Sequence, residues 1–580
     1  MHLRHLAPIV ILLVACGRAS TVATPAPMPS AAAVGPETSV AALLGRLSVR
    51  DKIAQLVMPW IPGTYAAYDD AGFERAEAWV DSLHVGGVIV SIGSPLDVAA
   101  KLNRLQQRSS LPLLVGSDFE GGTSLRLNGG TLFPPNMGVG ATGSDSAAYD
   151  LGRITALEGR AVGVQLAFAP VADVNNNPAN PIINTRAFGE DPAQVGRMVA
   201  AEVRGLQDFG MLATAKHFPG HGDTGTDSHL ALPVITSTWS RLDSVELVPF
   251  RAAIRAGVDV VMSAHIALPG IDSGQLRPGT VAPNILTGIL RDSLGFQGMI
   301  VTDALNMAGV ADAYGAEAGV RAFLAGADLL LQPADPRAAI DAMERAVASG
   351  MITPERLDAS VRRVLEAKRA LGLFARRTVA LDSIPAIVGS AAFQADAADI
   401  AARSIVMVKD SAGVIYSMVS RPPVNLVTYA EEENRQVGLA LALELRAQGF
   451  PVAMTRLWPS SGQASYDSVA ATLRRPGVVV FATADRPTAG RGTIGLPAAL
   501  TGLIARTARE RATVLISLGN PYVIAGLPEI GSYLIGWRSN AVTEQAVARA
   551  LAGAAPITGR LPIALPPTYA RGWGLQRHVP

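Results

Sequence analysis

The 580-residue sequence contains one cysteine, Cys16, and only 5% aromatic residues. A single cysteine allows neither an intramolecular disulfide nor a zinc–thiolate framework within one chain. The formal net charge is +1 and charged residues make up 17% of the chain, so the basic surplus typical of nucleic-acid binding is missing. We therefore expect no nucleic-acid partner, and a substrate that is small or neutral.

Long apolar runs are also scarce, and only the N-terminus carries one with basic residues before it. The run from Leu6 to Ala15 is too short to span a bilayer and is typical of a signal peptide. Residues 13–17, LVACG, resemble the lipobox of bacterial lipoproteins, in which the cysteine is lipidated after cleavage.

These features predict a lipoprotein signal peptide over residues 1–16 and a flexible tether over residues 17–40, which are rich in Ala, Pro, Ser and Thr. The protein would then be exported and anchored through lipid on Cys16 to a bacterial membrane, in the periplasm or at the cell surface. A plain secretory leader with an accidental cysteine is the alternative.

Residues 41–375 alternate short apolar runs with amphipathic segments, a pattern that predicts a parallel α/β fold. Eight runs qualify as strands, which is the number in a TIM-type (β/α)8 barrel; a doubly wound open sheet is the structural alternative. The predicted strands are Gln55–Pro59, Gly87–Ser91, Leu113–Ser117, Gln165–Ala169, Met211–Ala215, Val258–Ser263, Met299–Thr302 and Asp328–Leu331.

A second set of apolar runs predicts a C-terminal α/β sandwich domain over residues 401–580, joined to the barrel by a linker over residues 376–400. This region has few conspicuous clusters of ionisable residues. The predicted strands are Ser404–Val408, Val424–Thr428, Pro451–Thr455, Gly477–Ala482, Thr513–Leu518 and Tyr533–Trp537.

Polar residues follow the predicted barrel strands at the point where each strand ends. They are Asp118 to Gly122, Asp173, Lys216 with His217, His265 and Asp303. In a closed barrel the C-terminal ends of the strands form one face, so we expect these side chains to converge on one mouth. The proline-broken polar segment from Asn175 to Arg186 predicts a binding loop at the same face.

The segment KHFPGHGDTGTDSH, residues 216–229, concentrates three of the eight histidines of the chain. Pro219 and Gly220 exclude a zinc-binding helix between His217 and His221. A metal loop formed by His221, Asp223 and His229 and an ordinary solvated loop both stay open as alternatives.

An acid–base function for the same segment explains more. Asp227 and His229 are two residues apart, so a turning loop can pair carboxylate and imidazole and prepare the imidazole for proton transfer. Asp303 ends a buried strand and is a nucleophile candidate, although it could instead cap the next helix. A nucleophile facing a proton donor is the arrangement for retaining glycoside hydrolysis.

The motifs resemble those of glycoside hydrolase family 3, and within it the β-N-acetylglucosaminidase group of two-domain lipoprotein type. The resemblance rests on residues 118–122, DFEGG; residues 184–192, NTRAFGEDP; residues 216–222, KHFPGHG; residues 227–229, DSH; and residues 301–307, VTDALNM.

The resemblance implies that Asp303 is the nucleophile, His229 the acid/base and Asp227 its partner. It implies that four residues hold sugar hydroxyls, and it leaves His265 and Met307 as further candidates. The sugar-holding residues are Asp118, Arg186, Lys216 and His217. The chain departs from the family at Phe119 and Thr123, where the family usually has glutamine and arginine, and its nucleophile motif is Val-Thr-Asp in place of Ser-Asp-Asp. Thr123 removes a cation next to the site that the resemblance would otherwise imply.

We therefore expect a monomeric retaining β-N-acetylhexosaminidase that needs no metal or cofactor and acts on a GlcNAc-containing glycan or muropeptide. Three alternatives stay open: a phosphorylase, because a neutral histidine base repels phosphate less than a carboxylate would; a β-glucosidase or β-xylosidase of the same family; and a non-catalytic glycan-binding lipoprotein.

Overall fold

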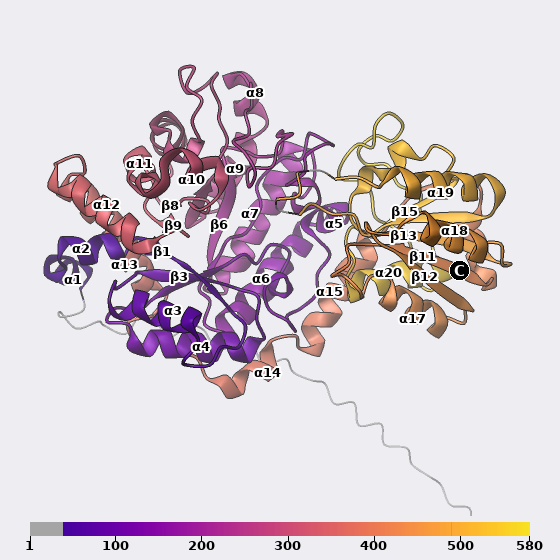
Figure 1. The fold of residues 1–580 in the computed structure, drawn as a ribbon, viewed down its shortest axis with the longest axis horizontal. Coiled ribbons are helices and arrows are strands. Elements are labelled where there is room, and N and C mark those ends of the chain that lie inside the picture. The colour runs from indigo at the N-terminus through magenta and orange to yellow at the C-terminus, as the bar shows by residue number, and fades with distance from the viewer. Residues whose placement is uncertain (1–38, 489, 493, 580) are drawn as a thin grey trace, which may run out of the picture.

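The computed structural model describes residues 39–488, 490–492 and 494–579. Two bodies lie side by side, a rounded helix-covered body formed by the N-terminal part of the chain and a layered body formed by the C-terminal part (Figure 1). The predicted signal peptide, Cys16 and nearly all of the tether lie outside the described residues. None of the helices within the described ranges is both long enough and apolar enough to cross a membrane.

The first body is a parallel barrel, as predicted. Strands β2 to β8 form a 7-stranded sheet in chain order, and β1 pairs in parallel with β9. Val301 of β8 also forms a parallel bridge with Leu329, beside β9, so the ring of strands closes. The strands are β1 Val57–Met58, β2 Trp60–Pro62, β3 Gly87–Ser91, β4 Leu114–Ser117, β5 Leu166–Ala167, β6 Leu212–Phe218, β7 Val260–Ser263, β8 Met299–Val301 and β9 Leu330–Leu331.

The first predicted strand is split in the structure. Pro59 lacks an amide hydrogen and separates β1 from β2, so that β1 pairs with β9 while β2 pairs with β3. The fifth predicted strand corresponds to β6 and is longer than expected. It continues past Ala215 through Lys216 and His217 to Phe218. Both residues are therefore held by the strand itself and do not lie in the loop after it.

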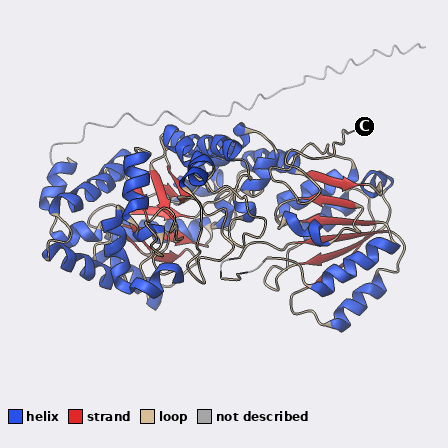
Figure 2. Cartoon of the chain, turned by 90° about the horizontal axis from the view of Figure 1, so that it is seen from above, coloured by secondary structure: helices blue, strands red, loops and turns tan. Residues whose placement is uncertain are grey.

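Helices cover the outside of the barrel, as Figure 2 shows from above. Helix α7 illustrates why they form: Asp191 accepts the amide hydrogen of Gln194, Pro192 occupies the first turn, and Val195, Val199 and Val203 repeat every four residues on the buried face. The helices are α1 Val40–Arg46, α2 Val49–Ala54, α3 Ala71–Asp81, α4 Pro95–Arg108, α5 Asn136–Ala141, α6 Asp145–Ala161, α7 Pro192–Asp208, α8 Trp239–Ser244, α9 Leu247–Arg255, a π-helix Asn284–Ser293, α10 Ala308–Tyr314, α11 Ala318–Ala325, α12 Pro336–Ala348 and α13 Pro354–Ala370.

The second body contains a 6-stranded sheet in the order β10-β15-β14-β13-β11-β12. All neighbours run parallel except β10 and β15, which are antiparallel. The strands are β10 Val406–Asp410, β11 Val424–Tyr429, β12 Val452–Leu457, β13 Val478–Thr483, β14 Thr513–Ser517 and β15 Ser532–Ile535.

Alternate residues of these strands enter two hydrophobic layers, one on each face of the sheet. Leu426, Val480 and Ile516 pack with α17 and α20, whereas Val427, Phe481 and Leu515 pack with α18 and α19. A sheet covered by helices on both faces is the predicted α/β sandwich. The helices are α16 Val414–Ser417, α17 Leu439–Ala447, α18 Gln463–Thr472, α19 Ala498–Glu510 and α20 Ala541–Ala552.

The connection between the two bodies is largely helical. It contains α14 Ile384–Ile387 and α15 Ala391–Ser404, whose Ile400 packs in the barrel core while Ala401 packs in the core of the second body. Helix α5 of the barrel also contributes Met137 and Ala141 to the second core. Because α15 and α5 each contribute residues to the core of the barrel and to a core of the second body, the second body is held against one edge of the barrel.

Candidate active site

The C-terminal ends of the barrel strands open into a cavity of about 770 Å³, a size typical of small-molecule sites. The cavity contains all the predicted catalytic and sugar-holding side chains except Asp227, which lies buried directly behind His229. Met307 also lines it, whereas His265 does not. The wall opposite the barrel is formed by the second body. Its lining residues are Arg486, Pro487, Thr488, Leu518, Trp537 and Arg538.

A buried ion network forms the floor of the cavity. Lys216 donates to Asp118 Oδ1 at 3.0 Å and lies 2.6 Å from Glu120 Oε1. Arg186 forms two parallel hydrogen bonds of 2.8 Å to the carboxylate of Glu120. Paired in this way, the cations and carboxylates hold one another in fixed positions with hydrogen-bonding edges toward the cavity.

Electrostatics keeps this network ionised in spite of burial. Burial alone would raise the pKa of Glu120, but the charges of Arg186 and Lys216 outweigh it and hold this pKa well below its ordinary value. The pKa of Asp118 is lowered in the same way, against burial, by Lys216 and Arg126. Burial would lower the pKa of Lys216, and the two carboxylates reverse this effect and raise it.

Glu120 belongs to the motif over residues 118–122 but was absent from the residues predicted to hold the sugar. Glu120 follows the same strand as Asp118, two residues further along the chain, and this position is the signal that could have identified it. Arg126 was missed for a different reason, since it lies outside the motif. Its guanidinium donates to Asp118 Oδ2 at 3.3 Å and lines the cavity.

Arg126 also bears on the departures from the family pattern. Thr123 is buried and donates its hydroxyl hydrogen to Glu158, which also accepts hydrogen bonds from Thr131 and Gly389. Residue 123 therefore has a structural role behind the cavity. Phe119 is likewise fully buried. The cation expected at position 123 is missing, but Arg126 brings a guanidinium to Asp118 from three residues further along the chain.

Asp173 organises the histidine segment; it was predicted to lie at the barrel mouth, but no role was assigned to it. Its carboxylate accepts from the His221 amide at 2.7 Å, from the His217 amide at 3.2 Å and from His217 Nδ1 at 2.7 Å. Since a carboxylate only accepts, His217 Nδ1 carries the hydrogen and Nε2 faces Arg186 at 3.3 Å. Asp173 therefore fixes the orientation of His217 toward the cavity.

His221 stabilises the loop and does not face the reaction. Its two ring nitrogens contact the hydroxyls of Thr224 at 2.8 Å and Ser228 at 3.1 Å, and burial lowers its pKa to about 4. Asn180 braces the same loop by donating to the carbonyl groups of His221 and Gly222, both at 2.9 Å. With both nitrogens engaged, His221 is not arranged as a metal ligand together with Asp223 and His229.

Asp227 and His229 form the predicted pair. Asp227 Oδ1 accepts from both the amide and Nδ1 of His229, each at 2.9 Å. Nδ1 therefore carries a hydrogen, and Nε2 is the ring atom left for proton exchange. Asp227 is 1% exposed and His229 36%, so a buried carboxylate orients an accessible imidazole.

The second oxygen of Asp227 is held by the other body. Asp227 Oδ2 accepts a hydrogen bond of 2.8 Å from the backbone amide of Gly490. Gly490 lies in the loop between β13 and α19, and its neighbour Arg491 pairs with Glu431 and lies 3.7 Å from Asp485. The hydrogen bonds to the Asp227 carboxylate thus come from both bodies, His229 of the barrel and Gly490 of the second body.

Asp303 lies across the cavity mouth, after β8. Its carboxylate accepts only the amide of Ala304, at 2.8 Å, among the described residues. It does not cap α10, since Met307 occupies the cap position there. Burial would raise its pKa, but the imidazoles of His265 and His217 and the Ala304 amide outweigh burial and lower it. A carboxylate with a free oxygen that stays ionised is suited to nucleophilic attack.

His265 supports Asp303 from behind the cavity. Its Nε2 lies 2.9 Å from the Ala304 carbonyl and its Nδ1 lies 2.8 Å from the Thr280 hydroxyl. Burial lowers the pKa of His265. Of the two roles considered for it, contact with the site and structural packing, the geometry favours support of the backbone that carries Asp303.

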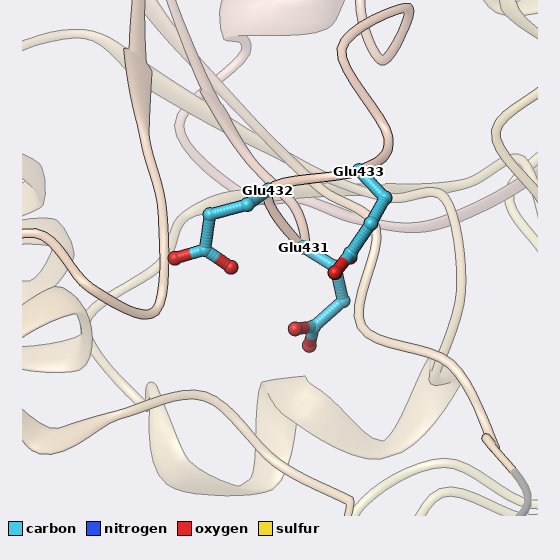
Figure 3. A group of neighbouring side chains, drawn as sticks. All are labelled: Glu431, Glu432 and Glu433. Atoms are coloured by element: carbon cyan, nitrogen blue, oxygen red, sulfur yellow. The ribbon is translucent and has the colours of Figure 1, made fainter.

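The second body carries an acidic cluster of Glu431, Glu432 and Glu433 (Figure 3), and no other group of carboxylates or histidines in the described ranges lies close enough to hold a metal ion. Glu431 pairs with Arg491, and Glu432 accepts the Ser460 amide at 2.9 Å. Two of the three carboxylates are therefore engaged by protein partners.

Carboxylates and an imidazole at the mouth of a parallel barrel, above paired groups that can bind hydroxyls, form the active site of a glycoside hydrolase. Residues 48–367 match the glycosyl hydrolase family 3 N-terminal domain. The chain belongs to glycosyl hydrolase family 3.

Three similar proteins span both bodies. A β-N-acetylglucosaminidase/β-glucosidase of Cellulomonas fimi is 33% identical over 499 residues, which cover 83% of this chain and 88% of that protein. A family 3 β-N-acetylglucosaminidase structure from Paenibacillus sp. str. FPU-7 matches with a TM-score of 0.79 and 33% identity, over 90% of this chain and 99% of that one. The β-glucoside phosphorylase BglX bound to 2FGlc matches with a TM-score of 0.83 and 28% identity, over 91% and 97%.

Proposed function

We propose that the protein is a retaining β-N-acetylhexosaminidase that removes terminal β-linked GlcNAc from peptidoglycan-derived or other glycans. The observation that carries this proposal is the pairing of His229 with the buried Asp227 in the cavity that also contains Asp303. Similarity to β-N-acetylglucosaminidases over most of the chain supports the sugar.

The proposed reaction has two steps. In the first, protonated Nε2 of His229 gives its proton to the glycosidic oxygen while an Asp303 oxygen attacks the anomeric carbon, so the bond to the leaving group breaks and a glycosyl ester forms. In the second, neutral His229 removes a proton from water, which attacks the anomeric carbon and releases Asp303. Asp227 orients the imidazole and stabilises its cationic form in both steps.

The ion network supplies the binding that this reaction needs. Asp118 and Glu120 present acceptors, and Lys216, Arg126 and Arg186 present donors, to hydroxyl groups on one side of the sugar. Hydrogen bonds that strengthen as charge develops on the ring lower the barrier.

The proposal is tested by product analysis on aryl β-GlcNAc, β-glucoside and β-xyloside substrates. We expect β-GlcNAc to be preferred, the β-anomer to be released first, and a glycosyl group to be found on Asp303 by peptide mass spectrometry after rapid quenching. Initial release of the α-anomer would overturn the retaining mechanism, and a preferred glucoside or xyloside would overturn the sugar. Undiminished glycan binding without turnover of any aryl glycoside would indicate a non-catalytic binder.

Phosphorolysis is the second candidate, favoured by the similarity to BglX and by the use of a histidine in place of an anionic base. Repeating the assay in phosphate buffer distinguishes the two reactions, because a phosphorylase yields sugar 1-phosphate and a hydrolase yields free sugar. EDTA should leave the rate unchanged; a loss of activity that added metal restores would contradict the metal-free mechanism.

We also propose that the enzyme is exported and anchored through lipid on Cys16, as LVACG over residues 13–17 indicates. Metabolic labelling with a palmitate analogue should mark the wild type and not Cys16→Ser. Absence of label from the wild type as well as from the variant would indicate a plain secretory signal.

A further inference from the structure

The second body contributes two arginine side chains to the cavity. They differ from the cations of the barrel in their lack of a carboxylate partner among the described residues. In the barrel, Arg126, Arg186 and Lys216 each contact Asp118 or Glu120. Arg486 and Arg538 line the same cavity, yet neither guanidinium has a hydrogen bond or ion pair to any residue that the structure describes. The two other carboxylates of the cavity wall, Asp303 after β8 and Asp312 on α10, both belong to the barrel, and neither pairs with Arg486 or Arg538.

The backbone of Arg538 is held by hydrogen bonds, whereas its side chain has no partner among the described residues. It follows Trp537, which is 1% exposed and donates its indole N–H to the Ser404 carbonyl at 2.8 Å. The Arg538 amide donates to Gly536 at 2.8 Å, and its carbonyl accepts the Thr543 hydroxyl. The fixed backbone places the five donors of the guanidinium at the cavity wall, with no acceptor among the residues that the structure describes.

The charges around Arg538 are mostly of its own sign. Burial and the neighbouring cations Arg486 and Arg126 lower the pKa of Arg538 to about 10, and only Glu120 opposes them among the causes of the shift. The side chain is still cationic at neutral pH. A partly buried cation beside other cations is unfavourable, and an anion placed beside it would gain charge-assisted hydrogen bonds.

We propose that Arg486 and Arg538 form a subsite for an oxyanion, a carboxylate or phosphate, beside the sugar-holding residues. This inference rests on the proposed function, because it takes the ligand to be a glycan or a co-substrate of the glycosidase site. Two sources provide the same chemistry: an anionic group carried by the glycan, such as the lactyl carboxylate of N-acetylmuramic acid, or free inorganic phosphate.

The test compares two disaccharides that share a terminal β-1,4-linked GlcNAc. GlcNAc-MurNAc carries a lactyl carboxylate on the second sugar and chitobiose does not. We expect the wild type to favour the anionic disaccharide in kcat/KM. Losing two charge-assisted hydrogen bonds should lower this preference about tenfold or more in Arg486→Gln/Arg538→Gln. Arg538→Lys, which keeps the charge but not the planar fork, should retain part of it.

A second arm uses inorganic phosphate at fixed ionic strength. If the oxyanion is free phosphate, the wild type forms sugar 1-phosphate or is inhibited by phosphate, the double variant loses that response, and the two disaccharides react alike. Arg509→Gln is the matched control, since Arg509 lies in the second body but pairs with Glu529 away from the cavity. It should behave as the wild type in both arms.

The proposal is overturned if the double variant changes both disaccharides by the same factor and leaves the phosphate response unchanged. Failure of the proposed function is seen separately, as absence of turnover of neutral aryl β-GlcNAc by the wild type. In that case calorimetric binding of the two disaccharides still tests the subsite: equal affinities for both, unaltered by the double variant, together with no binding of phosphate, reject it.

Discussion

The two walls of the cavity differ in whether their charged side chains are paired with one another. On the barrel wall, Glu120 and Asp118 neutralise Lys216 and Arg186, so each of these four charges has a partner at hydrogen-bond distance. On the second wall, Arg486 and Arg538 have no such partner among the described residues. Paired charges form a fixed surface that can bind neutral hydroxyl groups, whereas unpaired cations can bind a ligand of opposite charge.

The walls also differ in how they support the proposed chemistry. The barrel places Asp303 and His229 on its own loops, and the second body contributes a backbone amide to the far oxygen of Asp227. Catalysis would then depend strongly on barrel side chains and more weakly on the second body. The following predictions test that difference, beginning with the largest effect.

Removing the Asp303 carboxylate should have the largest effect. Asp303→Ala should lower kcat on aryl β-GlcNAc by at least about 10⁴-fold, because it removes the carboxylate that is proposed to form the glycosyl ester. Circular dichroism and thermal unfolding should match the wild type. The control Asp341→Ala removes a carboxylate that pairs with Arg50 on the outer surface and should keep full activity. An Asp303→Ala rate near that of the wild type would reject Asp303 as the nucleophile.

Removing His229 should have a large effect that depends on the leaving group. His229→Ala should slow chitobiose cleavage by about 10²- to 10⁴-fold, and slow cleavage of a dinitrophenyl glycoside much less, since that leaving group needs little protonation. His84 offers a matched control, because its Nδ1 pairs with Asp51 at 2.9 Å far from the cavity. An equal loss on both substrates would contradict the acid role.

Breaking the paired network should affect stability as well as activity. Glu120→Gln leaves buried Lys216 and Arg186 short of a negative partner, and we expect a loss of about 3 kcal/mol in unfolding free energy, measured by urea titration. Arg538→Gln should change it by less than about 1 kcal/mol, because no protein ion pair is lost. Equal losses in the two variants would show that the walls do not differ in this respect.

Loosening the loop of the second body should have a moderate effect. Arg491→Ala removes the pairing with Glu431 that restrains the loop carrying the Gly490 amide. We expect about a tenfold loss of kcat on poor leaving groups, little change on dinitrophenyl glycosides and unchanged KM, because only the orientation of Asp227 is disturbed. The control is Arg509→Ala. A loss that is the same for both leaving groups would indicate a general structural defect.

At neutral pH the smallest effect is expected from His221, which acts on the pH dependence of stability below pH 7. The pKa of His221 falls from 6.5 to about 4 on folding, so the unfolded chain binds more protons between those pH values and stability falls as the pH drops through that window. His221 should account for a loss on the order of 3 kcal/mol. His221→Asn should therefore show a shallower acid limb in urea titrations from pH 7 to pH 4; an unchanged slope would contradict this.

Much of the catalytic half was predictable from the sequence. The barrel strands were located by apolar runs, and Asp118, Lys216 and Asp303 follow or end those strands, so their meeting at one mouth followed from the barrel rule. The pairing of Asp227 with His229 was predictable because the two residues are close in sequence.

Other features were not predictable, because their partners are far apart in the chain. Asp173 holds His217 and His221 from 44 and 48 residues away, and Gly490 reaches Asp227 across 263 residues. The split of the first strand at Pro59 likewise depends on β9 pairing with β1. Hydrogen bonds of this kind depend on tertiary distance, which no local pattern encodes.

The sequence by itself determined the fold class, the chemistry of the barrel loops and the residue types that the site presents, because these depend on periodicity and on short spacings. Only the tertiary structure decided which charges are paired. Arg186 and Arg538 are equally cationic in sequence, but one lies 2.8 Å from Glu120 and the other faces the cavity without a partner among the described residues. The distance from a cation to the nearest protein carboxylate decides whether the two form an ion pair or the cation can pair with a bound anion.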